Sequence, residues 1–317
     1  MTLRLVVRRA AWHEHVARVA SRTGDLLPVV KGNGYGFGRP VLMAHAVRMS
    51  TTVAVGSVFE VGDVPAGTTA LVLTPVGDAL PEALPQSTIF TVGSRTHVDQ
   101  LVRHGVTPRV VVKVASTMQR FGVAASDAAD LATYARSRSC EPVAWSIHPT
   151  LAGTDDDRAR ETISLASHLD PGLPLHLSHV VDGLATVRAA LPRFAVVARL
   201  GTSLWLGDKS TVQLQCDVLE CREYVRGTAI GYRASTLDGD GHVVVVGAGT
   251  SHGVTTLPDG RSPFHFERTR LALVEPPHMH VSMLFAPTGQ PTPYVGDRID
   301  VQQPMTRVAV DLIDWVS

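Results

Sequence analysis

Residues 26–38 read Leu-Leu-Pro-Val-Val-Lys-Gly-Asn-Gly-Tyr-Gly-Phe-Gly, and the interpretation of the whole chain depends on them. The first five residues form an apolar, β-type run, and Lys31 follows them directly. Burying a lysine at a strand end is costly unless its amine is used, for instance to bind phosphate or to form a Schiff base. The alternating glycines after it allow close backbone approach. The Gly-Lys-Ser/Thr order of a phosphate loop is missing, and the plain alternative is a solvated loop lysine.

Short β-type runs recur through the first two thirds of the chain. They lie at 26–30, 52–56, 69–74, 87–92, 108–114, 142–147, 174–178 and 195–199. Helical patterns separate several of them, most clearly at 41–49, 127–138 and 155–168. Ser126 and Thr154 precede the last two of these helices and are good N-caps. Eight strands with intervening helices predict an α/β fold, a parallel (β/α)8 barrel of the TIM type rather than an open sheet.

The composition changes after about residue 210, where Val, Thr, Tyr, Gly and Pro dominate. Further β-type runs lie at 212–224, 229–234, 242–246, 269–274, 280–285, 298–301 and 307–312. Turn signals such as Asp238-Gly239-Asp240-Gly241 separate them. This part of the chain is predicted to be a second, all-β domain.

Charge and cysteine content exclude several classes of function. The 317 residues carry 29 Lys+Arg and 29 Asp+Glu, so nothing electrostatic favours nucleic acid or an anionic membrane as a partner. No apolar run approaches the ~20 residues that a membrane helix needs, and we expect no signal peptide. Cys140, Cys216 and Cys221 are an odd number without metal-ligand spacing. We therefore expect a cytoplasmic protein with reduced thiols and no metal.

Polar residues end five of the eight predicted strands, where barrel enzymes place their catalytic groups. They are Lys31, Arg120 just past the fifth strand, His148, the pair Ser178–His179, and Arg199. Each one alone is explained by a rim ion pair or a satisfied polar group. Together they indicate an active site.

Three segments resemble motifs of the alanine racemase family. Residues 29–38 resemble its pyridoxal-phosphate lysine motif, Val-Val-Lys-Ala-Asn-Ala-Tyr-Gly-His-Gly. Thr117–Gly122 is similar to its Gly-Met-Asn-Arg-Leu-Gly, and Ala198–Gly207 to its Val-Arg-Pro-Gly-Ile-Ala-Leu-Tyr-Gly. The resemblance covers almost the whole chain. It implies a strand at 1–8 that joins the β domain, a cofactor-binding barrel at 9–209 and a C-terminal β domain at 210–317.

The resemblance also implies an activity, that of a pyridoxal-phosphate-dependent racemase or epimerase acting at Cα of a free amino acid. Lys31 would form the internal aldimine and exchange the α-proton. Arg120 would contact the cofactor and the substrate carboxylate, and Lys113, seven residues earlier and often carbamylated in the family, would orient it. Arg199 would face the ring nitrogen and leave it unprotonated, because arginine does not give up its proton. His148 would support Arg199.

The remaining implied contacts concern the phosphate and the partner subunit. Tyr35 matches a phosphate-binding tyrosine, and Gly201 and Thr202 would offer backbone N–H groups. Ser178 or His179 stands where the family has an Asn-Ser pair. The family forms homodimers in which the β domain of one subunit completes the active site of the other.

The second catalytic base departs from the family pattern. The family's Gly-Tyr-Ala-Asp-Gly aligns best with residues 249–253, so Thr250 replaces the tyrosine. His252 is the candidate second acid/base because its ordinary pKa suits the role, and the alternative is a solvated loop histidine. Near the C-terminus, Leu284 replaces a family Asp, and the usual phosphate-binding tyrosine has no clear counterpart.

Three other functions stay open. One is a protein that binds pyridoxal phosphate with little or no turnover. Another is a different reaction at Cα, such as decarboxylation or aldol-type cleavage. The third is a barrel enzyme without a cofactor that uses Lys31 for a Schiff base with its substrate.

Overall fold

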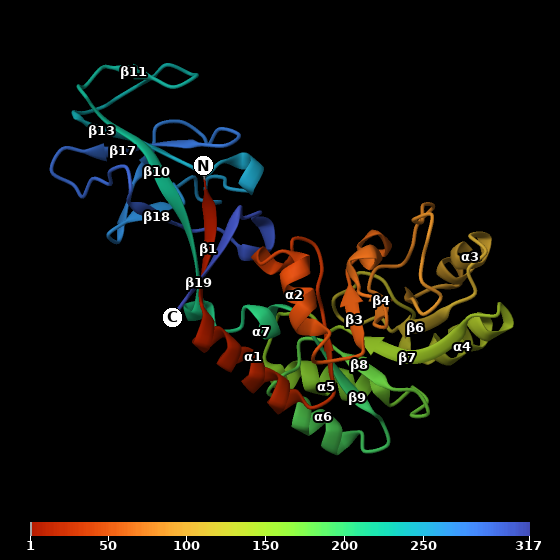
Figure 1. Cartoon of the computed structure of the whole chain (residues 1–317). Coiled ribbons are helices and arrows are strands. Elements are labelled where there is room, and N and C mark those ends of the chain that lie inside the picture. The colour runs from red at the N-terminus through yellow and green to blue at the C-terminus, as the bar shows by residue number, and fades with distance from the viewer. Residues whose placement is uncertain (1) are drawn as a thin grey trace. The chain divides into compact units, whose positions relative to one another are not determined.

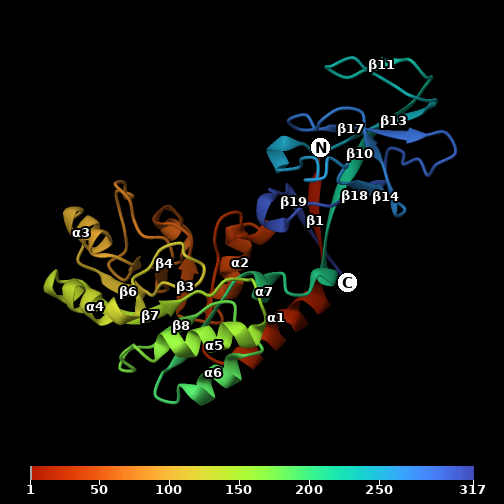
Figure 2. The same cartoon turned by 180° about the vertical axis from the view of Figure 1, so that it is seen from behind.

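The structure is a computed structural model that describes residues 2–317. By its internal contacts the chain forms two compact units (Figures 1 and 2). The barrel unit contains His15–Gly32 and Arg39–Gly207. The β unit contains residues 2–14, Asn33–Gly38 and Asp208–Ser317.

The barrel unit is built on eight parallel strands. These are β2 (Leu26–Pro28), β3 (Thr52–Val55), β4 (Thr69–Val72), β5 (Ile89–Val92), β6 (Arg109–Lys113), β7 (Glu141–Ile147), β8 (Leu175–Leu177) and β9 (Val196–Leu200). Each pairs with its neighbour in chain order from β3 to β9, and β9 pairs with β2. The ring closes where the Val30 N–H donates to the Ala54 carbonyl at 2.8 Å. All eight predicted runs form strands of this barrel.

Helices connect most of the barrel strands (Figure 1). They are α2 (Arg39–Ala46), η2 (Val58–Asp63), α3 (Arg95–Arg103), η3 (Ala125–Asp127), α4 (Ala128–Ser137), α5 (Asp155–Ala166) and α6 (Leu184–Ala190). Helix α1 (Arg9–Thr23) precedes the first barrel strand, and α7 (Thr202–Trp205) follows the last one. Thr154 caps α5 as expected, with its hydroxyl accepting the Asp157 N–H. Ser126 was expected to be the N-cap of the helix that follows it, α4, and this expectation was wrong. A 3-10 turn occupies residues 125–127, and the Ser126 hydroxyl donates to the side chain of Asp127.

The interior of the barrel changes from apolar to polar along its strands. Its middle is filled by a cluster of seven buried apolar side chains from the segments of six strands, β2 to β7: Leu27, Val29, Ala54, Leu71, Ile89, Val111 and Ala144. Ser146, Ser178 and Arg199 lie at the C-terminal ends of β7, β8 and β9, and all three are buried. The packed middle therefore supports a polar layer at one end, and this end is the barrel mouth.

The β unit is an antiparallel sheet with one parallel pair. Its main strands are β1 (Leu3–Arg8), β10 (Val212–Tyr224), β13 (Gly241–Val246), β17 (Ser282–Pro287), β18 (Arg298–Val301) and β19 (Leu312–Val316). Shorter segments are β11 (Ala229–Ile230), β12 (Ser235–Thr236), β14 (Phe264–Phe266), β15 (Thr269–Arg270), β16 (Ala272–Leu273), and the 3-10 turns η1 (Gly34–Gly36), η4 (Lys209–Thr211), η5 (Thr250–His252) and η6 (Met305–Arg307). The last strand begins at Leu312, so the expected strand at 307–312 was wrong in position. The predicted fold class, a (β/α)8 barrel followed by an all-β domain, is confirmed.

The long strand β10 holds the β unit together. It pairs with β1 over Leu3 to Val7, with β18, and with β13. β1 also pairs in parallel with β19. Alternate residues of β1, namely Leu3, Leu5 and Val7, are completely buried, which gives the strand one core-facing side.

The Gly-rich segment Asn33–Gly38 belongs to the β unit by its contacts. The Asn33 amide donates to the carbonyls of Met305 at 2.7 Å and Val308 at 2.6 Å. Gly36 has φ +91°, and a Cβ there would lie 3.2 Å from the Met305 carbonyl oxygen. At least this glycine is therefore needed for close approach between two backbones.

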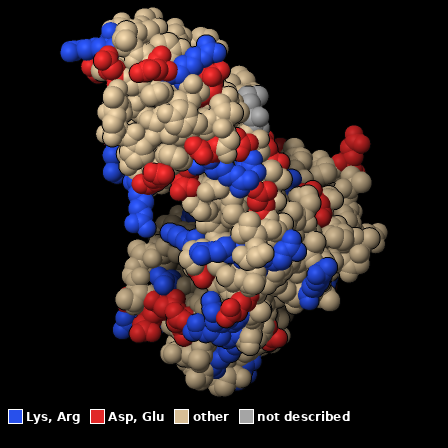
Figure 3. Space-filling model, turned by 60° about the vertical axis from the view of Figure 1, so that its left-hand side comes forward, with Lys and Arg blue, Asp and Glu red and all other residues tan. Residues whose placement is uncertain are grey.

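Charged side chains of both signs are interspersed on the face seen in Figure 3, as the balanced composition leads one to expect. Within residues 2–317 no helix is long and apolar enough to cross a membrane. The same residues contain no group of three or more His, Cys, Asp or Glu side chains placed to hold a metal ion.

Candidate active site

Lys31 lies three residues beyond β2, in the barrel mouth. Its side chain is exposed, so the premise of a buried lysine was wrong. The pKa of Lys31 is nevertheless lowered, first by partial loss of hydration and then by the charges of Arg120 and Arg199, while Glu60 acts in the opposite direction. A lowered pKa leaves more of the amine unprotonated and nucleophilic near neutral pH.

Arg199 is the centre of a buried hydrogen-bond cluster drawn from three neighbouring strands. Its Nε donates to Ser178 Oγ at 2.9 Å, its Nη1 to Ser146 Oγ at 2.9 Å, and its Nη2 to His148 Nδ1 at 3.0 Å. Because a guanidinium only donates, His148 Nδ1 must be an acceptor, and the neutral ring carries its hydrogen on Nε2. The cluster fixes both the guanidinium and the tautomer of the histidine.

The two histidines of the mouth are held neutral. Burial and the nearby cations, Arg199 first among them, lower the pKa of His148 to about 2. His179 packs edge-on against His148 with ring centres 4.3 Å apart. Its Nδ1 donates to the Pro149 carbonyl at 3.0 Å, and its pKa is lowered mainly by burial. Ser178 and His179 therefore both belong to the cluster, one through Arg199 and the other through His148.

Lys113 ends β6 and is 5% exposed. Burial lowers its pKa to about 7, with further lowering by the charges of Arg199 and Arg120 and an opposing effect of Glu161. Arg120, seven residues later, is exposed, and its guanidinium carbon lies 4.7 Å from the centre of the Phe121 ring. The two residues that the sequence placed in one motif thus share one electrostatic environment.

A tight loop carries Arg120. Its ends meet where the Val123 N–H donates to the Lys113 carbonyl at 2.9 Å. Gly122 has φ +143°, and a Cβ there would lie 2.6 Å from the Ala115 nitrogen. The Thr117 N–H donates to Glu161 Oε1 at 2.6 Å, which ties the loop to α5.

Gly201 and Thr202 follow β9 directly, at the start of α7. The first N–H groups of a helix have no partner within it, which is the basis for expecting these two residues to bind phosphate. Tyr35 is 4% exposed with φ +55° and lies in the segment that groups with the β unit. The phosphate-binding roles of all three residues stay predictions.

Thr250 and His252 lie in the 3-10 turn η5 of the β unit. Thr250 is exposed, whereas His252 is 8% exposed, which excludes the solvated loop histidine considered as the alternative. His252 Nδ1 accepts the Gly249 N–H at 3.1 Å, so its Nε2 donates to Asp311 Oδ2 at 3.1 Å. Both ring nitrogens are engaged, and the role of His252 as a second base stays a prediction.

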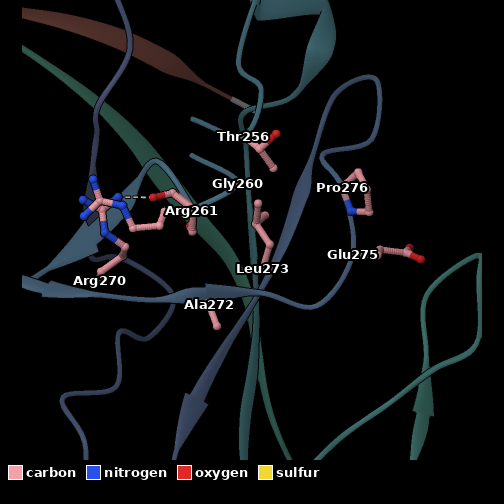
Figure 4. Close-up of a pocket in the computed structure, with 9 residues that line it drawn as sticks. Thr256, Gly260, Arg261, Arg270, Ala272, Leu273, Glu275 and Pro276 are labelled. Carbon is pink, nitrogen blue, oxygen red and sulfur yellow. Dashed lines mark hydrogen bonds between the residues drawn. The ribbon is translucent and has the colours of Figure 1, made fainter. Parts of the chain in front are cut away.

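A cavity of about 480 Å³ lies in the β unit (Figure 4). None of the sequence-predicted site residues lines it. Its charged side chains have protein partners: Arg261 pairs with Asp259, Arg270 donates to Gln302, and Glu275 accepts backbone N–H groups of Tyr232 and Arg233. The lysines with lowered pKa values are instead at the barrel mouth, where we place the candidate active site.

Three residues of the site were missed in the sequence. Ser146 lies two positions before His148, so strand alternation could have placed both on one face. Glu60 and Glu161 lie neither at a predicted strand end nor in one of the motifs, so the sequence around them did not indicate a site residue. They sit on helical segments and reach the site only through the tertiary fold.

The eight-stranded barrel and the β unit together define the class, a protein of the alanine racemase fold. Residues 7–206 match the family described as alanine racemase, N-terminal domain, and this is more than half of the chain. The chain belongs to that family. No curated protein matches the sequence.

Several solved structures of similar fold are alanine racemases. The one from Bartonella henselae, with covalently bound pyridoxal phosphate, is 15% identical, with a TM-score of 0.72 and complete coverage of both chains. The biosynthetic one from Pseudomonas aeruginosa is 16% identical, with a TM-score of 0.70, covering 100% of this chain and 99% of that one. The one from Streptomyces lavendulae is 16% identical, with a TM-score of 0.69, covering 100% and 97%. Identities of this size establish the fold alone.

Proposed function

We propose that the chain is a pyridoxal-phosphate-dependent enzyme acting at Cα of a free amino acid, with racemisation or epimerisation as its leading activity. One observation carries the proposal. Two lysines with lowered pKa values and two arginines share the barrel mouth, and neutral His148 is bonded to one of the arginines. Such a site offers a nucleophilic amine beside binding groups for two anions.

The residues present fit this cofactor. Its phosphate and the substrate carboxylate are both anionic, and the groups that act on the Lys31 amine include two guanidinium cations. Pyridoxal phosphate, when bound, supplies an electron-withdrawing ring that stabilises negative charge at Cα. The metal-free character predicted from the sequence stays part of the proposal.

Each residue of the mouth has a definite task in this proposal. Lys31 attaches to the cofactor aldehyde and holds or returns the Cα proton on its own face. Arg120 binds and orients the substrate carboxylate. Arg199 donates to the ring nitrogen and cannot protonate it, because arginine keeps its proton at working pH. His148 orients Arg199 because its own Nδ1 accepts a hydrogen bond from Nη2 of the arginine.

The phosphate is assigned to backbone and neutral donors. Gly201 and Thr202 supply N–H groups at the start of α7, where barrel enzymes often bind phosphate. Tyr35 supplies a hydroxyl. Ser178 and His179 line the mouth beside Arg199 and His148.

The second face of the cofactor is assigned to the β unit of a partner subunit. His252 is the candidate acid/base there, beside Thr250. It must release either the Gly249 N–H or Asp311 before a ring nitrogen can exchange a proton. We therefore propose a homodimer with shared active sites in the cytoplasm, a location supported by the three free cysteines.

Covalent attachment at Lys31 is tested by borohydride trapping. The sequence has three lysines, Lys31, Lys113 and Lys209, so peptide mass spectrometry can assign the modified one. We expect pyridoxal phosphate to give a coloured protein, and reduction to mark Lys31 alone. Lys31→Ala should stay colourless, whereas Lys209→Ala should behave as the unaltered chain. Colourless, unmarked protein of normal fold would refute the proposal.

A second function is a cofactor-binding protein with little or no turnover. It is favoured by Thr250, which is a poor acid or base, and by the engagement of both His252 nitrogens. Exchange of the α-hydrogen in deuterated water, across D- and L-amino acids, separates the two functions. Exchange with inversion supports a racemase, and loss of carbon dioxide or an aldehyde indicates another reaction at Cα. Marking of Lys31 without any exchange supports the binding protein.

A further inference from the structure

Glu60 contacts the residue that follows Lys31 and the residue that follows the neighbouring strand β3. It lies in η2, after the second barrel strand. Its Oε1 accepts the Gly32 N–H at 3.0 Å, and its Oε2 accepts the Gly56 N–H at 2.7 Å. One carboxylate therefore joins the turn after Lys31 to the end of β3.

The same turn is held from its other side. Arg39 Nη1 donates to the Gly32 carbonyl at 2.6 Å, and Arg39 Nε pairs with Asp63. Gly32 has φ +59°, a conformation that needs fixing by its surroundings because glycine is otherwise free to leave it. Glu60 and Arg39 thus clamp the peptide groups of Gly32, directly after the lysine.

Glu60 is also close to the Lys31 side chain itself. A Cβ placed on Gly56 would lie 3.0 Å from Glu60 Oε2 and 3.1 Å from Lys31 Cβ. The lysine stem and the carboxylate therefore flank the same small residue. Among the charged groups that act on Lys31, Arg120 and Arg199 favour its neutral form and Glu60 favours its charged form.

We propose that Glu60 is a positioning residue for Lys31: it fixes the turn that carries the ε-amine and supplies the negative charge that partly offsets the two arginines of the mouth. This inference rests on the proposed function, because it assigns Glu60 to the same amine. A fixed turn holds the amine in one place for attack, and the carboxylate keeps a fraction of it protonated as a proton donor to Cα.

The test measures the Lys31 amine without cofactor. Trace acetylation of the protein across a pH series, read by mass spectrometry, gives the pH of half-reaction of Lys31, with exposed Lys209 as the internal reference. Glu60→Gln removes the charge at nearly constant shape. We expect it to move the half-reaction of Lys31 downward by about one pH unit and leave that of Lys209 unchanged. Glu141→Gln, an exposed glutamate at the start of β7, is the matched control and should move neither.

A second variant separates charge from anchoring. Glu60→Asp keeps the charge, but its shorter side chain reaches only one of the two N–H groups. We expect a Lys31 half-reaction close to that of the unaltered chain, with faster hydrogen exchange at Gly32 or Gly56. An unchanged Lys31 titration in a folded Glu60→Gln protein overturns the proposal, as does an equal shift in both variants. If pyridoxal phosphate does not mark Lys31, the proposed function is refuted. The titration of Lys31 is measured without cofactor, so its result remains valid in that case.

Discussion

The surroundings of Lys113 strongly change the acid–base chemistry of its amine. Its pKa of about 7, against an ordinary value of 10.5, makes roughly half of the amine unprotonated at neutral pH. An unprotonated amine adds carbon dioxide and loses a proton, giving a carbamate. The resulting negative charge would lie in the field of Arg199 and Arg120, which replaces repulsion by attraction.

We therefore predict that Lys113 forms a carbamate. Protein equilibrated with 13C-labelled carbon dioxide should give a carbamate resonance that Lys113→Met abolishes and Lys209→Met retains. At constant dissolved carbon dioxide the signal should grow from pH 6 to pH 8, because the folded-state pKa of about 7 lies inside that window. A signal that persists in Lys113→Met would assign the carbamate elsewhere.

A second prediction at the residue scale concerns the cluster around Arg199. Ser146→Ala removes the acceptor of one buried Nη1–H group, and leaving a buried donor unbonded costs ~1–3 kcal/mol. Urea unfolding should show a loss of that size. Ser164→Ala on the exposed face of α5 should change stability by less than ~0.5 kcal/mol. An equal loss of unfolding free energy in both variants would mean that the hydrogen bond to Arg199 contributes nothing to stability.

The loop between β6 and α4 is the element on which Arg120 depends. Gly122→Ala places a Cβ 2.6 Å from the Ala115 nitrogen, so backbone must move. Gly67→Ala is the matched control, because Gly67 has φ +84° and nothing within 4 Å of its added Cβ. We expect the control to cost ~1 kcal/mol, the conformational penalty alone, and Gly122→Ala to cost clearly more. The additional loss should come with weaker binding of the amino-acid substrate, measured as a raised KM.

The cap of α5 gives an element-scale prediction with a pH signature. Hydrogen bonds from Thr154, backbone first, lower the pKa of Asp157 to about 2, below the ordinary 3.8. A carboxyl with a depressed folded-state pKa stabilises the fold above its unfolded pKa and loses that effect as the pH falls through the folded one. Thr154→Ala should cost ~0.5–2 kcal/mol at pH 6 and less at pH 2.5, by urea unfolding. Thr133→Ala, on the exposed face of α4, should lower stability by the same amount at both pH values.

The elements also show where prediction from sequence ends. The eight barrel strands and the cap at Thr154 were found because their signals are local: apolar runs and a residue directly before a helix. The predicted N-cap at Ser126 was wrong because a 3-10 turn, which the amino-acid composition does not reveal, precedes α4. Glu60 could not be found, since its partners Gly32 and Gly56 are brought to it only by the closed barrel. The candidate site was therefore predictable at strand ends and unpredictable in its supporting contacts.

At the scale of the whole molecule, the β unit is assembled from separate parts of the chain. β1 has β10 on one side and β19 on the other, and its inward residues Leu3, Leu5 and Val7 are completely buried. The segment Asn33–Gly38 is bonded to backbone near residues 305 and 308. A chain ending at Gly207 keeps all eight barrel strands and loses every one of these partners.

We predict that residues 1–207 do not form a stable barrel alone. Their first strand would expose three apolar side chains, and the segment after Lys31 would lose the Asn33 bonds that fix it, next to the lysine on which the proposed chemistry depends. The fragment should melt without cooperativity in near-ultraviolet circular dichroism and should not be marked at Lys31 by pyridoxal phosphate and borohydride. A full chain nicked between Gly207 and Asp208 is the control, because its parts stay associated, and it should melt cooperatively. A cooperative melt of the fragment alone would show that the barrel strands suffice, and that the β unit serves the active site without being needed for folding.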